Sequence, residues 1–308
     1  MPTRIELATA GQRSAIVQYG ACQARWLSAM SLSGFVTVNG LKLHFLDHGG
    51  AGKPALVCIH GLTGNAHNFD GLALHLAPAY HVLALDVRGR GDSEWGPAID
   101  YTPQNYLSDL RGFLDALAIR RVTLIGTSMG GMISMLFAGG HPERVERLVL
   151  NDIGPDLDPR GLTRIMNYVG DAPAEFDDLR AVADYYRETY PPARNLSDGE
   201  LEQWVKWSVK PGPNGKLVWK MDPQVRKPLR RGGSAARPLD MWVPFARITA
   251  PILVVRGAES DILAPQTVAR MKTVAREVHS VEVPGVGHAP SLTEPEALTA
   301  IKQFLGLA

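Results

Sequence analysis

From residue 34 onward the chain alternates short apolar runs with longer stretches of helical periodicity. Apolar positions recur at helical spacing over about 66–77, 103–118, 128–140, 264–276 and 292–306. Most of the apolar runs lack regular alternation, which is typical of strands buried on both faces of a parallel sheet. These runs are Ala55–Ile59, Tyr80–Leu85, Val122–Ile125, Val145–Leu150, Ile252–Val255 and Val281–Val283. The repetition predicts an α/β fold, with an open, mostly parallel sheet and helices on both faces.

Two regions depart from this rhythm. Phe35–Val38 and Leu41–Leu46 alternate apolar and polar residues around Asn39-Gly40, which predicts a hairpin at the start of the sheet. From Pro155 to about Arg247 no strand is predicted, while aromatic residues and prolines accumulate among charged ones. We interpret 155–247 as a helical cap inserted after strand 6, and 34–154 with 248–308 as the core.

Residues 1–33 are predicted to be an N-terminal extension. Residues 1–29 contain three arginines and one glutamate but no compact apolar segment with a small-residue cleavage site, so they do not resemble a secretory signal. A start of the protein at Met30 is one alternative, and a short amphipathic arm or an organelle presequence is another.

Composition excludes several classes of function. Among 308 residues, 45% are hydrophobic and 20% charged, and a net charge of +1 gives no general attraction to nucleic acid or to an anionic membrane. No apolar stretch is long enough to span a bilayer. Of the two cysteines, Cys22 and Cys58, the second lies within an apolar run, so no disulfide framework is expected. We therefore expect a cytoplasmic protein, whose oligomeric state the sequence leaves open.

Gly126-Thr127-Ser128-Met129-Gly130 places a serine between glycines, directly after one predicted strand and before a helix. At such a turn the serine backbone is strained, and small residues two positions before and after it avoid clashes. The turn exposes the Ser128 hydroxyl as a candidate nucleophile and aims the Met129 N–H at a developing oxyanion. The alternative is a Gly-Ser turn that only caps the helix.

Other candidate groups follow other strands, whose carboxyl ends meet at one edge of a parallel sheet. After Ala55–Ile59, the turn His60-Gly61-Leu62 would direct the Leu62 N–H toward Ser128 as a second oxyanion donor, unless it is a simple loop. We expect His60 to brace this loop by hydrogen bonding. The charged, glycine-containing segment 86–93 is interpreted as a structural loop.

A candidate acid and a candidate base follow the last two strands. Glu259 and Asp261 compete as the carboxylate that would hold a histidine, and we favour Asp261 because it lies at the tip of its loop. Its alternative role is a helix-entry cap near Pro265. His288 lies in a glycine-rich loop after the final strand and is the candidate general base, with a surface or capping histidine as the alternative.

The order Ser128, Asp261, His288, each after a strand, resembles that of the α/β-hydrolase superfamily over about residues 34–308. The resembling segments are His60-Gly61, 86–93, 126–131, 256–261 and Gly287-His288. The resemblance implies an acyl-enzyme on Ser128, with Leu62 and Met129 as oxyanion donors, and requires no metal or organic cofactor.

Departures from related families narrow the expected reaction. A serine at the turn disfavours the epoxide hydrolases and haloalkane dehalogenases of this fold, which use aspartate there. Ala289 and Pro290 stand where C–C bond hydrolases usually place a tryptophan after the histidine. The chain resembles the carboxylesterase, lactonase and perhydrolase group, so we expect hydrolysis of a small or medium carboxylic ester or lactone. A C–C bond hydrolase, a perhydrolase and a slow-turnover, receptor-like ligand-binding protein remain as alternatives.

The cap is expected to choose the substrate through aromatic side chains that roof a pocket over Ser128. Residues 171–202 hold nine acids and three bases, whereas 206–237 hold nine bases and one acid. These halves either pair or form solvated faces, and a sharper hypothesis has one basic residue of 226–231 bind a substrate carboxylate. Substrate-binding candidates are Trp204, Trp207, Trp219 and Arg230.

Overall fold

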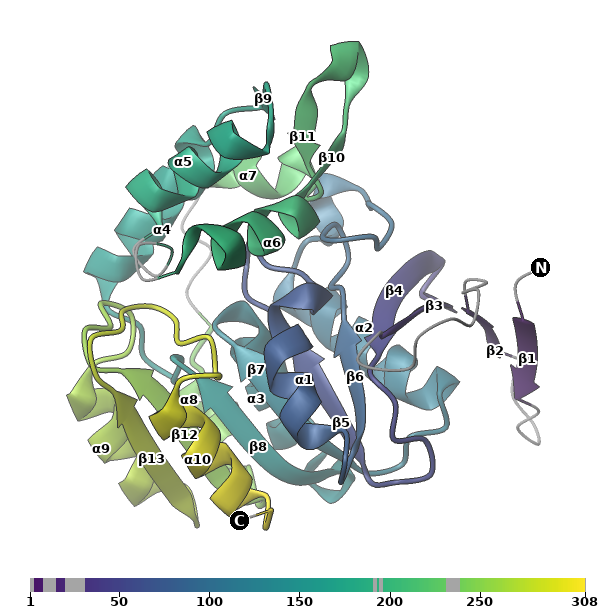
Figure 1. Ribbon diagram of the computed structural model, residues 1–308. Coiled ribbons are helices and arrows are strands. Elements are labelled where there is room, and N and C mark those ends of the chain that lie inside the picture. The colour runs from purple at the N-terminus through teal and green to yellow at the C-terminus, as the bar shows by residue number, and fades with distance from the viewer. Residues whose placement is uncertain are drawn as a thin grey trace.

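The computed structural model describes residues 31–190, 193, 196–226 and 239–307 in full, and the backbone alone of 3–7, 15–19 and 227–230. Within these residues, ten strands form one sheet in the order β1-β2-β3-β4-β6-β5-β7-β8-β12-β13 (Figure 1). From β6 to β13 neighbouring strands run parallel, whereas β3 and β4 form the predicted antiparallel hairpin around Asn39-Gly40. The strands are β3 Leu32–Val38, β4 Leu41–Asp47, β5 Ala55–Ile59, β6 His81–Leu85, β7 Val122–Thr127, β8 Val145–Asn151, β12 Ile252–Gly257 and β13 Val278–Val283.

The N-terminal segment contributes to this sheet. β1 (Thr3–Leu7) pairs antiparallel with β2 (Ala15–Tyr19), and β2 pairs antiparallel with β3. The hydrophobic pattern predicts no strand before Phe35, so these two strands are a finding of the structure.

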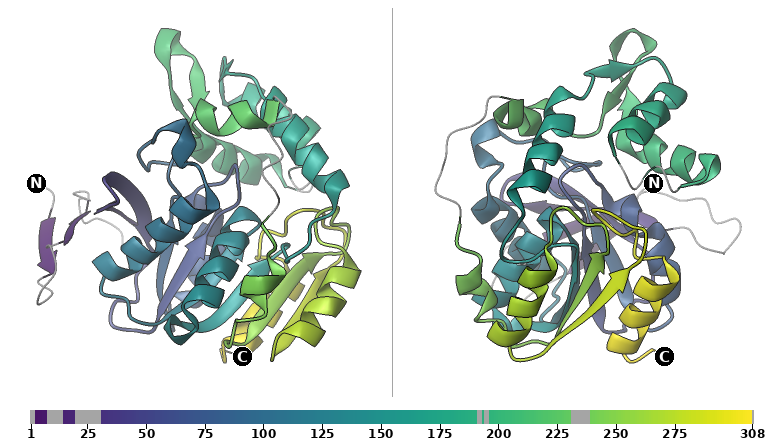
Figure 2. Two further views of the ribbon diagram at one scale, coloured as in Figure 1. Left: turned by 180° about the vertical axis from the view of Figure 1, so that it is seen from behind. Right: turned by 90° about the vertical axis from the view of Figure 1, so that its left-hand side faces the viewer.

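Helices cover both faces of the sheet, as predicted (Figures 1 and 2). One apolar core lies beneath α1 (Asp70–Leu76) and α10 (Pro295–Phe304), and includes Leu72 and Ile301. The other core lies beneath α2 (Pro103–Ala116), α3 (Met129–Gly140) and α9 (Pro265–Val274), and includes Phe113, Phe137 and Met271. Short 3-10 helices span Ala66–Phe69, Ala98–Asp100, Pro142–Arg144 and Pro213–Gly215.

The insertion between β8 and β12 packs around an apolar cluster of its own and lies over one end of the sheet (Figures 1 and 2). The prediction that it lacks strands is wrong, since a small antiparallel sheet joins its helices. Runs of two or three residues are too short to show periodicity. The elements are α4 Pro159–Asp171, β9 Glu175–Phe176, α5 Leu179–Thr189, α6 Asp198–Ser208, β10 Val209–Pro211, β11 Leu217–Trp219 and α7 Pro223–Arg230.

The chain rejoins the core before residue 248. α8 (Trp242–Phe245) packs on α3, and Phe245 is fully buried in the core beneath it. A Cβ at Gly139 of α3 would collide with the carbonyl oxygen of Pro244, so this contact requires glycine. The helical part of the insertion therefore ends before α8.

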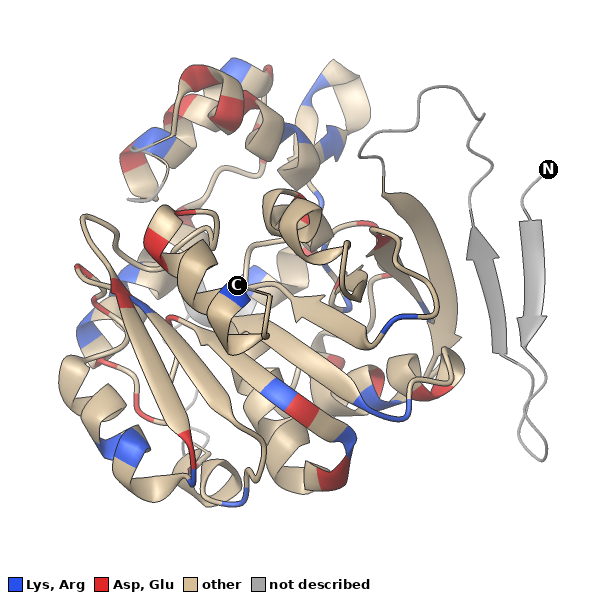
Figure 3. Ribbon diagram, turned by 60° about the horizontal axis from the view of Figure 1, so that its bottom comes forward, with Lys and Arg blue, Asp and Glu red and all other residues tan. Residues whose placement is uncertain are grey.

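Charged side chains lie mainly on helices and loops, and the central strands β5, β6 and β7 contain none (Figure 3). This distribution follows from burial of those strands on both faces, since an unpaired charge there would lose its hydration. Among the described residues, no helix combines the length and the apolar character needed to cross a membrane.

Candidate active site

Ser128 occupies the sharp turn between β7 and α3. Its backbone has φ 51° and ψ −114°, a conformation that L-residues rarely adopt, and its N–H donates to the Asn151 carbonyl at 3.0 Å. A Cβ at Gly126 would lie 2.5 Å from the Gly130 oxygen, and one at Gly130 would collide with the carbonyl oxygen of Ile59. The two glycines thus permit the close packing that holds the serine in this strained turn.

His288 lies beside Ser128 and is buried. Its Nε2 is 3.0 Å from Ser128 Oγ, and its Nδ1 is 2.7 Å from Asp152 Oδ2. An ionised carboxylate only accepts hydrogen bonds, so Asp152 places the ring proton on Nδ1. Nε2 is then free to accept the Ser128 proton, which is the arrangement that activates a serine.

Asp152 follows β8 and is completely buried. Besides His288, its carboxylate accepts the Gly257 N–H at 2.9 Å and the Ser260 hydroxyl at 2.5 Å. Its own N–H donates to the Val255 carbonyl at 2.7 Å. The end of β12 therefore holds Asp152 from both backbone and side chain, and three donors stabilise its charge.

The structure corrects the prediction that Asp261 holds His288. Asp261 instead accepts a two-pronged ion pair from Arg164 of α4, with Nε–Oδ2 at 2.5 Å and Nη2–Oδ1 at 2.8 Å. Hydrogen bonds from Arg164 hold the pKa of Asp261 below its usual range. The acid loop does contribute to the site, but through Ser260. Asp152 directly follows β8, and Asp261 lies four residues after the end of β12, so strand-end position makes both aspartates candidates without choosing between them.

The segments that carry the two predicted oxyanion donors, Leu62 and Met129, lie next to Ser128. The His60-Gly61-Leu62 turn passes beside Ser128, since a Cβ at Gly61 would lie 3.5 Å from the Ser128 Cβ. Met129 is the first residue of α3, whose N-terminus carries partial positive charge. The assignment of the Leu62 and Met129 N–H groups as oxyanion donors stays a prediction.

Arg90 joins these two residues from behind. Its side chain is fully buried, with Nε donating to the Leu62 carbonyl at 3.2 Å and Nη2 lying 3.5 Å from Met129 Sδ. Nη1 donates to the Arg88 carbonyl and to the Tyr106 hydroxyl, both at 2.9 Å. One guanidinium thus contacts the backbone of Leu62 and the side chain of Met129, and it places a positive charge beside both residues.

His60 braces its loop, as predicted. Nε2 accepts the Val87 N–H at 3.0 Å, so Nδ1 carries the proton and donates to the Gly61 carbonyl at 2.7 Å. Burial lowers the pKa of His60 from 6.5 to about 4, which keeps the ring neutral at neutral pH. His60 is therefore a structural residue of the Leu62 turn.

The structural interpretation of 86–93 is also confirmed. Arg88 donates to both oxygens of Asp109, and Asp86 accepts bonds from the Ala66 N–H, the Asp92 N–H and His44 Nδ1. Among the described residues, His44, Asp86 and Asp92 form one cluster whose ligand atoms lie within 4.8 Å of one another, a spacing that a metal could bridge. Asp86 already uses both of its oxygens for these hydrogen bonds, so we assign the cluster to the loop's structure.

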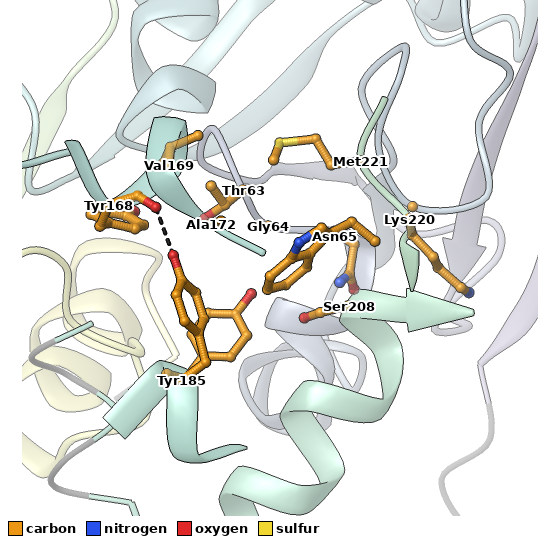
Figure 4. A pocket seen from close by; sticks show the side chains of 13 residues that line it. Thr63, Gly64, Asn65, Tyr168, Val169, Ala172, Tyr185, Ser208, Lys220 and Met221 are labelled. Carbon is orange, nitrogen blue, oxygen red and sulfur yellow. Dashed lines mark hydrogen bonds between the residues drawn. The ribbon is translucent and has the colours of Figure 1, made fainter. Parts of the chain in front are cut away.

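The insertion and the core segment 63–65 enclose a narrow pocket (Figure 4). It has room for about one water molecule. Its lining includes Thr63, the neighbour of Leu62, but not Ser128 itself. The remaining lining residues are Gly64, Asn65, Gly91, Tyr168, Val169, Ala172, Tyr185, Tyr186, Ser208, Trp219, Lys220 and Met221.

The predicted substrate-binding residues of the insertion separate in the structure. Trp219 lines the pocket, whereas Trp204 packs against Tyr186 at a centroid distance of 4.6 Å and does not line it. Trp207 stacks on His67 at 3.6 Å, where it joins the insertion to the core. The Arg230 side chain lies outside the described residues.

Among the described residues, Lys216 of the basic half of the insertion pairs with Asp177 of the acidic half. Arg226, one of the basic residues considered for a substrate carboxylate, donates instead to the Ala172 carbonyl just after α4. Lys220 pairs with Asp92 of the core at 2.8 Å, so part of the basic half fastens the insertion to the 86–93 loop.

Similarity to known proteins agrees with this geometry. Residues 56–301 match the sequence profile of the Alpha/beta hydrolase family. The chain is 38% identical over 294 residues to the 3-hydroxybutyrate-oligomer hydrolase of Cupriavidus necator, covering 90% of this chain and 99% of that one. It is 25% identical over 276 residues to the 2-(acetamidomethylene)succinate hydrolase of Mesorhizobium japonicum, covering 88% and 94%. The crystal structure of an alpha/beta hydrolase from Novosphingobium aromaticivorans aligns with a TM-score of 0.82 and 36% identity, covering 91% of this chain and 100% of that one. The chain therefore belongs to the alpha/beta hydrolase family.

Proposed function

We propose that the protein is a serine hydrolase that cleaves a small or medium carboxylic ester through an acyl-enzyme on Ser128. The observation that carries the proposal is the continuous hydrogen-bonded series from Ser128 Oγ through both nitrogens of His288 to Asp152. A strained serine within 3.0 Å of a correctly oriented imidazole is the arrangement that acyl transfer requires.

In the first half of the reaction, His288 Nε2 takes the Ser128 proton while Oγ attacks the ester carbonyl carbon. The carbonyl electron pair moves onto oxygen, where the N–H groups of Leu62 and Met129 stabilise the negative charge. Asp152 stabilises the imidazolium without taking its proton. Collapse of the tetrahedral species breaks the bond to the alcohol oxygen, which leaves with the proton from His288.

In the second half, water replaces the alcohol. His288 removes one proton from this water as its oxygen attacks the acyl carbon, and the oxyanion forms again between the same two N–H groups. Collapse breaks the bond to Ser128 Oγ, which recovers its proton from His288. The carboxylic acid leaves, and every step uses groups of this chain and water alone.

Similarity narrows the class of substrate. A relative at 38% identity acts on oligomers of 3-hydroxybutyrate, which are linear esters of a short hydroxy acid. The narrow pocket beside Thr63 also favours short acyl groups, because a long chain would need several aromatic side chains to move. We therefore propose short esters of hydroxy acids as the preferred substrates, with lactones as cyclic members of the same class.

Labelling with a fluorophosphonate tests the reaction type. The wild-type protein is expected to label rapidly and the Ser128→Ala variant not at all, while a Ser108→Ala variant labels like the wild type. Ser108 is a half-buried serine on α2 and serves as the matched control. A folded wild-type protein that does not label would contradict the proposal and favour a ligand-binding role.

A series of p-nitrophenyl esters tests the acyl preference. We expect the highest kcat/KM for two to four acyl carbons, with γ-butyrolactone as the cyclic substrate and p-nitroacetanilide as the amide comparison. An optimum at eight carbons or more would contradict the assignment of the narrow pocket to the acyl group.

A further inference from the structure

Arg164 of α4 has one nitrogen for which the protein supplies no acceptor. Its Nε and Nη2 are occupied by Asp261, but Nη1 is buried and has no hydrogen-bond partner among the described residues. A guanidinium nitrogen of this kind carries two N–H donors, and leaving them buried without an acceptor is costly. An acceptor from outside the chain would remove this cost.

Two tyrosine hydroxyls lie close to the same guanidinium. Tyr168 and Tyr190 both interact electrostatically with Arg164, and their ring centroids are 6.3 Å apart. Tyr168 is one turn from Arg164 on the same face of α4. Burial raises the pKa of both hydroxyls, so both keep their protons at neutral pH. Two protonated hydroxyls therefore lie beside the unpartnered nitrogen of Arg164.

This group lies next to the proposed reaction centre. The Tyr168 hydroxyl interacts with Thr63, which follows Leu62 and also lines the pocket of Figure 4. The Tyr190 hydroxyl faces the backbone N–H of Ala289, which follows His288. Asp261 is close enough to His288 for their charges to interact. An acceptor bound by Arg164 would therefore lie beside the oxyanion turn and the proposed base.

We propose that Arg164 Nη1, with the hydroxyls of Tyr168 and Tyr190, binds the free carboxylate of an ester substrate. This inference rests on the proposed hydrolase function and specifies its substrate class as carboxylate-bearing esters. A carboxylate matches the site because it only accepts hydrogen bonds and pairs well with a planar guanidinium. Asp261 positions Arg164 by holding its other two nitrogens, so Arg164 presents Nη1 without a large loss of side-chain entropy.

A matched pair of substrates tests the proposal. 3-Acetoxybutyrate and 3-acetoxybutyramide contain the same acetate ester. The first carries a free carboxylate where the second carries a neutral carboxamide. Acetate release is measured for both. In wild type, kcat/KM is expected to favour the carboxylate. In Arg164→Gln that preference is expected to fall about 10- to 100-fold, mainly through KM, because one charged hydrogen-bonding group is lost.

Two further variants separate binding from side effects. Arg164→Gln leaves Asp261 unpaired, so the double variant Arg164→Gln/Asp261→Asn keeps the local net charge and is expected to lose the preference at least tenfold. Arg160→Gln removes an arginine that lies one turn earlier and pairs with Asp158, and it is expected to keep the wild-type preference. An equal loss on both substrates in the Arg164 variants, or an unchanged preference, would overturn the proposal.

Calorimetry with 3-hydroxybutyrate separates failure of the site from failure of the hydrolase function. Wild-type protein is expected to bind this carboxylate at least tenfold more tightly than 3-hydroxybutyramide, and Arg164→Gln to lose that difference. If this holds while neither ester is cleaved, the carboxylate site stands and the hydrolase function falls. Equal binding of both ligands by wild type would overturn the site.

Discussion

Two aspartates near His288 illustrate how the floor and the roof of the site differ. The floor consists of Ser128, Asp152 and His288 at the ends of β7, β8 and β13, and the roof is the inserted segment from α4 to α7. Asp152 is completely buried and held by Gly257 and Ser260, whereas the Asp261 side chain is 38% exposed and pairs with a roof residue. The same residue type after neighbouring strands thus serves two different parts of the site.

The difference concerns how fully the donors and acceptors are matched. In the floor, Asp152, His288 and Ser128 satisfy one another through hydrogen bonds of 2.7 and 3.0 Å, so their geometry is set before any ligand arrives. In the roof, Arg164 keeps one nitrogen without an acceptor within the described residues. A preorganised floor suits a chemical step shared by many esters, and an incomplete roof suits selection among them.

Substitution of Asp152 gives the largest expected effect. Asp152→Asn is expected to lower kcat on p-nitrophenyl acetate about 10⁴-fold. The amide stabilises the wrong tautomer of His288, and it does not stabilise the imidazolium that forms during the reaction. Stopped-flow or steady-state kinetics measure the loss, with circular dichroism to verify folding. A loss of less than tenfold in a folded Asp152→Asn protein would show that another group supports His288.

The second effect is an acid-dependent loss of stability from the buried His60. Burial lowers its folded pKa to about 4, below the value of about 6.5 in the unfolded chain. The unfolded state therefore binds the proton first, so stability is fully present above pH 6.5 and is lost as the pH falls to 4. Over this pH range the free energy of unfolding is expected to fall by about 3 kcal/mol because of His60.

Urea denaturation between pH 7 and 4 measures this dependence. It should be smaller in His60→Gln than in wild type, and unchanged in His279→Gln, a variant of an exposed histidine on β13. An equal pH dependence in wild type and His60→Gln would assign the acid sensitivity to other groups.

Arg90 is expected to give a smaller kinetic effect in the floor. Arg90→Met keeps much of the side-chain volume but removes the contacts to Leu62 and Met129. Losing one oxyanion donor typically costs about 10²- to 10³-fold, so displacing the donors should lower kcat about 10- to 100-fold with little change in KM. Partial rescue by Arg90→Lys would show that the charge contributes. An unchanged kcat would mean that the His60-Gly61-Leu62 turn keeps its position without Arg90.

The smallest kinetic effect is expected from Asp261. Asp261→Asn removes a charge that interacts with His288 without bonding to it, so kcat on p-nitrophenyl acetate should fall only about threefold, the scale of a partly screened charge. The comparison with Asp152→Asn on the same substrate is direct. A loss approaching that of Asp152→Asn would place Asp261, and not Asp152, behind the histidine during the reaction.

Much of the floor could be predicted because its signals are local. Ser128 is marked by glycines two positions away on each side, which the strained backbone requires, and the sheet by apolar runs that strands buried on both faces require. His60 was expected to brace its loop for a similarly local reason. The choice between Asp152 and Asp261 had no local signal, since both follow strands.

Sequence by itself determined the alternation of strands and helices, the strained serine and the position of His288 after the last strand, because each depends on neighbours within a few residues. Only the tertiary structure decided which aspartate contacts His288, since that depends on Arg164 arriving from α4 to pair with Asp261 and on Ser260 turning toward Asp152. It also decided that Arg164, and not Arg226, presents an open nitrogen near the site. Partners separated by about a hundred residues are set by packing, and no periodicity or spacing along the chain records them.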